Sequence, residues 1–496
     1  MATNAPEPLA PARVPLYRTI ADAIIRDIRR GRHLEGERLP ASRDLARSLE
    51  VNRATVHQAL QVLKREGWIE TNKGGGTRVA RRSSAGPLVG PAPAWDRIAS
   101  SLLLRIVSEP PATEPASAAY DLSRLAPDER DFPAAAFAAL LAEVARDGTL
   151  LAYGSPFGYR PLRETLARRL VRRGIPADPD ALLIVNGAQQ GLDLITRALV
   201  DPGDAVAVES PSYAGALSLL RAHRARLVGV PLDAEGMELP AFDRALAERP
   251  KFVYAIPDFQ NPTGLLTSAP RRGEIARRAA AAGVLLVEGA LPPPLAALAP
   301  DHVVHLGTIS KALFPGVRVG WIAGPREFVH RLAALKRVGE LTSPPVLQAA
   351  LNLFLTRGDY DRHLARTRAR LKGRLALAHR VVLSRFPIGT AVEKPAGGWV
   401  LWVRLPEGVP GRALVAAARE KGVLLSAGAD YLPDQTDVAA IRVSVARGSV
   451  QDLERALALA GGVARELARQ AARLRKGRGR LARGASEKTE AALIQI

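Results

Sequence analysis

The feature that most constrains the fold is a series of five short apolar runs, each of which leads into a turn or a helix. The runs lie within residues 181–200, 204–222, 251–264, 283–290 and 302–314, and Ala- and Arg-rich segments with helical spacing separate them. Strands that alternate with helices usually form a mainly parallel sheet covered by helices. From about residue 120 the sequence therefore predicts an α/β domain.

Three features follow the ends of these runs, where parallel sheets gather their functional groups. Gly187-Ala188-Gln189 opens a helix whose free N–H groups suit a phosphate, Asn261 lies in an Asn-Pro-Thr-Gly turn, and Lys311 precedes Arg318 by seven residues. Each has an ordinary explanation: a helix start, a turn residue or a surface lysine. Together they provide a phosphate cradle, a cation and an amine able to form a Schiff base, which is the set that pyridoxal phosphate needs.

Residues 14–82 predict three helices followed by a β-hairpin, with Lys73 and three glycines between the strands. Pro40 and Ser42 are capping signals for the second helix. Leu16, Ile20, Ile24 and Ile28 recur at helical spacing in the first helix, and Leu45 and Leu49 form the apolar face of the second. In the third helix the expected inward positions are Val56, Leu60 and Leu63. This pattern is typical of a winged helix-turn-helix, whose third helix enters the major groove with Arg53, Thr55, His57 and Gln58 on its early turns. The alternative is a three-helix protein-interaction module.

The positive charge is concentrated at the two ends of the chain. Of the net +21, residues 1–82 contribute +7 and residues 463–496 contribute +6. Basic segments of this kind favour a polyanion partner, although an Arg-rich composition can also serve solubility. Residues 463–496 begin with helical spacing and continue as a basic, Gly-interrupted run, which we expect to be partly disordered and which could add phosphate contacts.

Composition excludes several classes of protein. The 496 residues include no cysteine, which excludes disulfides, thiolate metal sites and cysteine nucleophiles, and we expect no metal site. No apolar run reaches the ~18 residues of a membrane span, and the N-terminus lacks a signal-sequence pattern, so we expect a cytoplasmic protein. Residues 83–119 are rich in Pro, Ala and Ser and predict a linker, with a short amphipathic helix between Trp95 and Val107.

Both regions resemble known families. The segment from Leu16 to Ala80, with its G-x-x-x-x-G-E-R-L-P-x-S-R-x-L-A signature, resembles the GntR-type DNA-binding domain. "YGSPFGYRPLRETLARRLVRRG", "IVNGAQQGLDL", "VESPSYAGA", "QNPTG", "GTISKALFPGVRVGW", "GGWVLWVRLP" and "IRVSVA" resemble, in that order, the fold-type-I aminotransferase domain. The combination is similar to the MocR subgroup of GntR regulators, which sense a ligand through pyridoxal phosphate.

The resemblance implies a fold, partners and roles for residues. It implies an aminotransferase-like domain over residues 120–460 with a small C-terminal α+β subdomain, a homodimer with shared sites, and operator DNA as partner. The implied DNA contacts are Arg43, Arg53, His57 and Gly75. The implied ligand contacts are Lys311 as the Schiff-base lysine; Arg318, Gly187, Ala188 and Gln189 at the phosphate; Tyr213, Asn261 and Ser310 beside the ring; Tyr153 reaching into the neighbour's site; and Arg442 at an effector carboxylate.

One segment departs from the family. The aspartate expected at the ring nitrogen falls at Gly289 and the expected tyrosine at Leu291, in a shortened loop that contains Pro292, Pro293 and Pro294. Without that carboxylate the ring nitrogen is not held protonated, and Cα–H cleavage should be much slower. Glu288 is one residue away. Strand alternation points its side chain to the opposite face, unless the register shifts by one residue.

Three interpretations follow from this departure. The domain binds pyridoxal phosphate, catalyses little and acts as a sensor of an effector such as an amino acid or a vitamin B6 compound. Alternatively, the pocket has degenerated and binds another ligand or none. In the third interpretation the chain is a working aminotransferase that carries a DNA-binding module. The missing aspartate counts against the third, and the presence of Lys311, Arg318 and Asn261 favours the first over the second.

Overall fold

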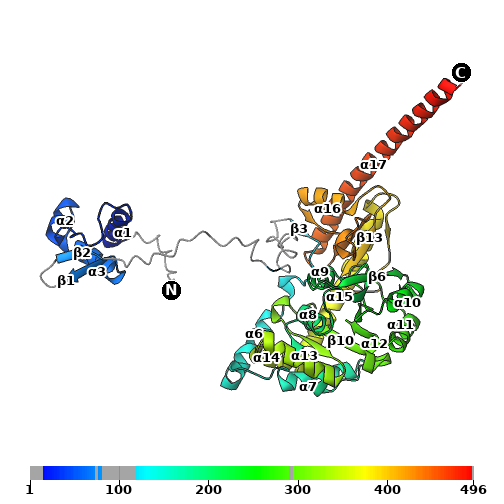
Figure 1. Ribbon diagram of the computed structural model, residues 1–496, viewed down its shortest axis with the longest axis horizontal. Helices are drawn as coiled ribbons and strands as arrows, with labels where there is room; N and C mark the ends of the chain where they lie inside the picture. The colour runs from blue at the N-terminus through cyan, green and yellow to red at the C-terminus, as the bar shows by residue number, and fades with distance from the viewer. Residues whose placement is uncertain (1–14, 73–75, 81–99, 101–118, 290–293, 494–496) are drawn as a thin grey trace, which may run out of the picture. The chain divides into compact units, whose positions relative to one another are not determined.

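The computed structural model describes residues 15–72, 76–80, 100, 119–289 and 294–493, with side chains described as far as Leu474. The chain divides into two compact units, Met1–Ala99 and Ser100–Ile496 (Figure 1). Gly75, Leu291 and the helix expected between Trp95 and Val107 lie outside the described residues. Within the described part of the chain, the helices lack the combination of length and apolar character that crossing a bilayer requires.

The first unit has three helices and a hairpin, as the sequence predicts. They are α1 (Leu16–Arg29), α2 (Ser42–Ser48), α3 (Arg53–Arg65), β1 (Ile69–Asn72) and β2 (Gly76–Val79), the last two antiparallel. Ile20 and Ile24 of α1 pack with Ala59 and Leu63 of α3 and with Trp68 to form the core. This core fixes the angle of α3, the helix expected to read DNA.

The helix details differ from the prediction in α2 and α3. The residue before α2 is Ala41, and the Ser42 side chain makes no capping hydrogen bond. Leu49 is 44% exposed, and Ala46 is the residue of α2 that is buried. A helix of seven residues has only about two turns, and a small side chain there lets α2 approach α3 closely. In α3, Val56 and Leu63 are buried as predicted, but the third buried residue is Ala59 and not Leu60, which is only half-buried.

The second unit is built on an eight-stranded sheet with the order β4-β11-β10-β9-β8-β5-β6-β7. Its strands are β4 (Leu182–Val185), β5 (Ala205–Ser210), β6 (Arg226–Asp233), β7 (Gly236–Met237), β8 (Phe252–Ala255), β9 (Leu285–Glu288), β10 (Val303–Thr308) and β11 (Gly320–Ala323). Neighbouring strands from β10 to β6 are parallel, while β11 and β7 run antiparallel to their neighbours. The predicted mainly parallel sheet is confirmed.

Helices cover both faces of this sheet. One face packs against α8 (Ala188–Leu199), α9 (Ala214–Ala222) and α13 (Arg326–Gly339). The other face packs against α6 (Ala134–Val144), α7 (Arg160–Val171), α10 (Leu239–Ala247), α11 (Ala269–Ala281), α12 (Leu295–Leu298) and α14 (Pro345–Thr356). Because both faces are covered, the strands are almost continuously apolar, and polar groups gather beyond the strand ends.

A smaller α+β subdomain follows, as expected. The long helix α15 (Asp359–Arg385) leads to the sheet β12-β13-β16-β15. The remaining elements are β12 (Ala391–Val392), β13 (Val400–Arg404), α16 (Gly411–Glu420), β14 (Val423–Leu424), β15 (Ser426–Ala427), β16 (Ala440–Ser444) and α17 (Val450–Leu493). A short strand near the start of the unit, β3 (Tyr120–Asp121), pairs with β14 and brings Ser123 and Leu125 beside the subdomain.

The C-terminal segment differs from the expected partly disordered tail. Helix α17 continues to Leu493 and includes the basic run at 473–484. The run contains no proline, and its Arg, Leu, Lys and Ala residues are good helix formers that offset the cost of the interspersed glycines.

Candidate functional site

One cavity of about 1880 Å³ brings together most of the residues predicted to bind the cofactor and effector. It lies beyond the ends of the sheet strands and is closed on one side by the small subdomain. The predicted residues that line it are Gly187, Ala188, Gln189, Tyr213, Asn261, Ser310, Lys311, Arg318 and Arg442. Tyr153 does not line it and is 82% exposed, so within one chain this residue stands apart from the site.

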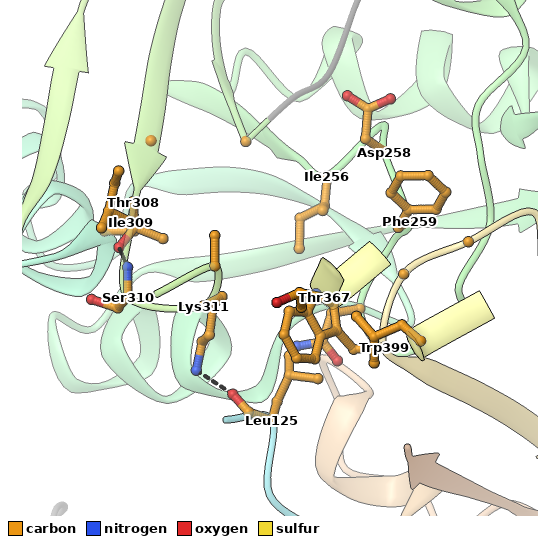
Figure 2. Close-up of a pocket in the computed structure, with 18 of the residues that line it drawn as sticks. Leu125, Ile256, Asp258, Phe259, Thr308, Ile309, Ser310, Lys311, Thr367 and Trp399 are labelled. Carbon is orange, nitrogen blue, oxygen red and sulfur yellow. Dashed lines mark hydrogen bonds between the residues drawn. The ribbon is translucent and has the colours of Figure 1, made fainter. Parts of the chain in front are cut away.

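Lys311 lies in the turn after β10 and reaches into the cavity. Its Nζ donates a hydrogen bond to the Leu125 carbonyl oxygen at 2.6 Å (Figure 2). Burial lowers the pKa of the Lys311 amine, and the positive charges of Arg442 and Arg318 lower it further. No carboxylate within the described residues pairs with this amine. Lys311 is therefore an amine that loses its proton more readily than an ordinary lysine.

The start of α8 and Arg318 form an anion-binding corner. Gly187, the residue before α8, has a φ of 83° and no side chain. No side-chain cap therefore bonds the first N–H groups of the helix. A Cβ at Gly187 would lie 3.0 Å from Nη2 of Arg318, so glycine permits the close approach of the guanidinium. Arg318 has a left-handed backbone, with φ of 46°, and its Nη2 donates to the Asn186 carbonyl at 2.6 Å. Helix dipole and guanidinium together favour a phosphate.

Arg442, on β16, is a buried cation without an acidic partner among the described residues. It is 6% exposed, and burial lowers the pKa of its guanidinium. Nη1 donates to Asn261 Oδ1 at 3.0 Å, Nη2 donates to the Ser123 carbonyl, and the group lies 5.0 Å over the Tyr431 ring. Its Nε has no hydrogen-bond partner in the same part of the chain. A buried charge normally has a counter-ion, so Arg442 is suited to a ligand carboxylate.

Four smaller contributions complete this part of the cavity. Because Oδ1 of Asn261 accepts from Arg442, a contact from Asn261 to a ligand would come from its amide nitrogen. The Tyr213 ring, in the residue before α9, lies over Gly215, where a Cβ would come within 2.5 Å of the hydroxyl. Ser310 is buried, and its Oγ has no partner in the part of the chain that is described. Gln189 turns its side chain to the Gly215 carbonyl, which leaves only its backbone N–H for a phosphate.

Gly289 and Glu288 lie as strand alternation predicts. Gly289 lines the cavity, and among the described residues a Cβ there would meet only the Leu306 carbonyl oxygen, at 3.6 Å. Glu288 is fully buried on the opposite face, where its carboxylate accepts the N–H groups of Leu295 and Ala296 at 2.8 and 3.0 Å. The register shift that would return Glu288 to the cavity does not occur, because its carboxylate caps α12 instead.

The sequence analysis missed a group of residues that line the same cavity. They come from β10, β11, α15 and the residues just after α7, and include His305, Trp321, Arg173, Tyr360 and Arg368. Arg173 and Trp321 each stand in a segment quoted for the family resemblance, although no ligand contact was expected of them. The other three lie outside those segments, and His305, within the apolar run at 302–314, was the one signal that the sequence offered for them.

In the first unit, the residues expected to contact DNA lie on the outer side of the helices. Arg43, Arg53 and His57 are exposed, and Thr55 is half-buried. Neither arginine forms an ion pair with another described residue of the chain. Asn52 caps α3 by accepting the Ala54 N–H at 2.9 Å, which fixes the helix start from which Arg53 projects. Two such arginines at helix starts suit phosphate and base contacts.

Comparisons with known proteins agree with this two-part organisation. Residues 16–79 match the family described as bacterial regulatory proteins of the gntR family, and residues 123–459 match aminotransferase class I and II. The probable rhizopine catabolism regulatory protein MocR of Rhizobium meliloti is 29% identical over 84% of this chain and 87% of that protein. The chain belongs to the MocR subgroup of GntR-type regulators.

Other relatives of this MocR-type regulator span nearly its whole length. The uncharacterized HTH-type transcriptional regulator YdfD of Bacillus subtilis is 31% identical, and the match covers 93% of this chain and 99% of YdfD. Among solved structures, the α-aminoadipate aminotransferase LysN of Thermus thermophilus superposes with a TM-score of 0.68 at 27% identity. That match covers 76% of this chain and 97% of LysN, which was crystallised with N-(5'-phosphopyridoxyl)-L-leucine.

Class I and II aminotransferases depend on pyridoxal phosphate, so the MocR-type site can be compared with that cofactor. The anion-binding corner fits its phosphate, and the Lys311 amine fits its aldehyde. The Ser310 Oγ is a further buried polar atom that lacks a partner among the described residues. Gly289, where the sequence analysis expects an acid in relatives, lines the same cavity. The residues that line the cavity therefore fit a bound cofactor.

Proposed function

We propose that this MocR-type regulator binds pyridoxal phosphate through Lys311, senses a carboxylate-bearing effector at Arg442, and catalyses little or no transamination. The observation that carries the proposal is the content of one cavity. It combines the amine of Lys311, the anion-binding corner, an arginine with no counter-ion among the described residues, and a glycine where the ring-nitrogen acid is expected. The effector class that suits this set is an amino acid or a vitamin B6 compound.

Each residue of the proposed site has a definite task. Arg318 and the first N–H groups of α8 hold the phosphate, while Tyr213, Asn261 and Ser310 border the ring. When bound, the cofactor supplies an electron sink and a visible chromophore. The lowered pKa of Lys311 keeps part of its amine unprotonated and able to link to an aldehyde. Arg442 binds and orients the effector carboxylate.

The proposed assembly is a homodimer. Tyr153 and Leu151 are 82% and 64% exposed on the segment before α7, which is unusual for large apolar side chains and suits burial by a second copy. In a dimer Tyr153 would reach the neighbour's cavity, and two winged helix-turn-helix units would contact two DNA half-sites. An effector with different affinities for two dimer arrangements would change the half-site spacing and so regulate transcription.

Covalent attachment of the cofactor is expected to depend on pH through Lys311. Burial, Arg442 and Arg318 hold its pKa below the ordinary value of 10.5, so attachment should reach half-completion below that pH. Arg442→Gln removes one of the repelling charges and should move the midpoint to higher pH. Visible absorbance between about pH 6 and 10 measures this. Arg404→Gln, on the neighbouring strand at an exposed site, is the control; an equal shift in both variants would contradict the assignment.

The DNA-binding role of α3 is tested with Arg53→Ala. If Arg53 contacts a base, affinity for a duplex selected from a random library should fall by about 1–3 kcal/mol; if it contacts a phosphate, the salt slope should fall by about 1. Fluorescence anisotropy at several salt concentrations separates the two. Arg65→Ala removes the same charge from the far end of α3 and should change binding little. Equal losses in both variants would mean that only overall charge matters.

A further inference from the structure

The cavity extends beyond the proposed cofactor site onto the other face of the sheet. There it is lined by β10 and β11 and by the facing sides of α7 and α15. We call this part the α7–α15 chamber; its lining includes Leu166, Arg169, Arg173, His305, Trp321, Tyr360 and Arg368. The whole cavity, at about 1880 Å³, exceeds the roughly 300–1,000 Å³ of ordinary ligand pockets. Space therefore remains after a cofactor and a small amino acid are accommodated.

The chamber is strongly cationic. Helix α7 and the residues just after it contribute Arg169, Arg172 and Arg173, and α15 contributes Arg368, Lys372 and Arg380. The acidic side chains that line the chamber already form ion pairs with arginines. Asp361 pairs with Arg169, at 3.0 Å between Nη1 and Oδ2, and Asp258 pairs with Arg272 at 2.6 Å. Arg368, Lys372 and Arg380 make no hydrogen bond or ion pair with any other described residue.

These cations lie close enough together that each positive charge disfavours the charged form of its neighbours. Burial lowers the pKa of Arg173, and although Tyr360 and Asp258 oppose this effect, the charges of Arg368 and Arg169 add to it. Arg173 is half-buried, whereas Arg172, Arg368, Lys372 and Arg380 are exposed, so this part of the cavity is open to solvent on the side of these cations. Like charges gathered around one volume favour an anion between them.

Two buried polar atoms on the chamber floor also lack partners among the described residues. Trp321 is 7% exposed and His305 is 2% exposed, and neither the indole Nε1 nor the imidazole Nδ1 makes a hydrogen bond within that part of the chain. The nearest acid to His305, Glu288, is 3.5 Å away and is occupied by α12. The indole lies over Gly307, where a Cβ would be 2.1 Å from the ring. An unsatisfied buried donor costs about 1–3 kcal/mol, which a ligand acceptor would recover.

We propose that the α7–α15 chamber is an anion-binding subsite for the far end of an elongated effector with at least two acidic groups. Arg442 holds the first carboxylate, and Arg368 with its neighbours on α7 holds the second acidic group. The apolar side chains of Leu166, Leu170, Leu364 and Leu371 line the chamber beside these cations and suit a hydrocarbon chain or ring between the two groups. The placement of the first carboxylate rests on the proposed function.

The probes that test this subsite are unbranched dicarboxylates from succinate to pimelate, and inorganic pyrophosphate. Each is titrated into the full-length protein in a phosphate-free buffer, with and without pyridoxal phosphate, and followed by tryptophan fluorescence and calorimetry. The variant is Arg368→Gln, whose exposed side chain lines the cavity and makes no hydrogen bond or ion pair with another described residue. The matched control is Arg366→Gln, an exposed residue of α15 outside the cavity.

Affinity should rise with dicarboxylate length, and Arg368→Gln should weaken the longest dicarboxylate at least about tenfold, the value of a charge-assisted hydrogen bond. Succinate binding and the cofactor absorbance should not change in this variant. A pyrophosphate affinity that falls in Arg368→Gln would also support the subsite and assign it to phosphorylated effectors. The proposal is overturned if neither probe binds, if length has no effect, or if Arg366→Gln loses as much affinity. Anion binding that depends on Arg368 without any cofactor absorbance would uphold the subsite and refute cofactor binding.

Discussion

Replacing Gly289 with aspartate is expected to raise the rate at which the cofactor-loaded protein converts an amino acid to its keto acid by about a hundredfold or more. A carboxylate at this position would favour protonation of the ring nitrogen, and a positioned proton-transfer group typically contributes about 10²–10⁴ in rate. The described part of the structure has room for it, because a Cβ at Gly289 would meet only the Leu306 carbonyl oxygen there, at 3.6 Å. The measurement is a single-turnover half-reaction followed by absorbance.

Gly289→Asn is the matched control, because it has the same shape without the charge. We expect it to leave the rate near that of the natural sequence. An aspartate variant no faster than the asparagine variant would show that position 289 does not face the ring nitrogen. A natural protein that already turns over at the rate of the aspartate variant would instead establish a working aminotransferase.

Arg442→Gln is expected to weaken binding of a carboxylate-bearing effector by at least about 30-fold. Truncating one partner of a buried, hydrogen-bonded charge pair costs about 2–5 kcal/mol. Arg442 is 6% exposed and has no acidic partner of its own among the described residues, so a ligand carboxylate would be its main counter-ion. A screen of amino acids for changes in the visible spectrum would identify the ligand to be titrated.

The control for Arg442 is Arg404→Gln, an exposed arginine of β13 that pairs with Glu393. It removes the same charge from the same small sheet and should leave the affinity unchanged. A loss limited to about twofold or threefold in Arg442→Gln would contradict the assignment. In that case Arg442 would serve to hold Asn261 and the Ser123 segment together rather than to bind ligand.

The architecture could be predicted from sequence because it depends on local patterns. Apolar runs that lead into turns predict parallel strands, and the strand-end rule then places Lys311 near the start of α8. Strand alternation alone predicted that Glu288 and Gly289 point to opposite faces, and Glu288 does face away from Gly289 and the proposed cofactor site. Arg442 could be assigned only through the family resemblance, because an arginine late in the chain has no local pattern that marks it as a ligand group.

The α7–α15 chamber could not be predicted, because it depends on which distant residues pair with each other. Arg169 and Arg368 are far apart in sequence, and only the folded structure shows that Asp361 is used by Arg169 while Arg368 has no acid among the described residues. The same reason explains the errors in α2. Whether Ala46 or Leu49 is buried depends on how closely α2 approaches α3, and periodicity over seven residues does not determine this distance.

The most direct test of the central claim is the visible absorbance spectrum of the purified protein mixed with pyridoxal phosphate, beside a Lys311→Ala variant. The account predicts a band from the linked cofactor in the natural protein that is absent from the variant. It also predicts the band despite Gly289, because the phosphate corner and the amine are both in place. A spectrum equal to that of free pyridoxal phosphate in both proteins would contradict the account, and would leave the aminotransferase-like domain as a scaffold for dimerisation or for another ligand.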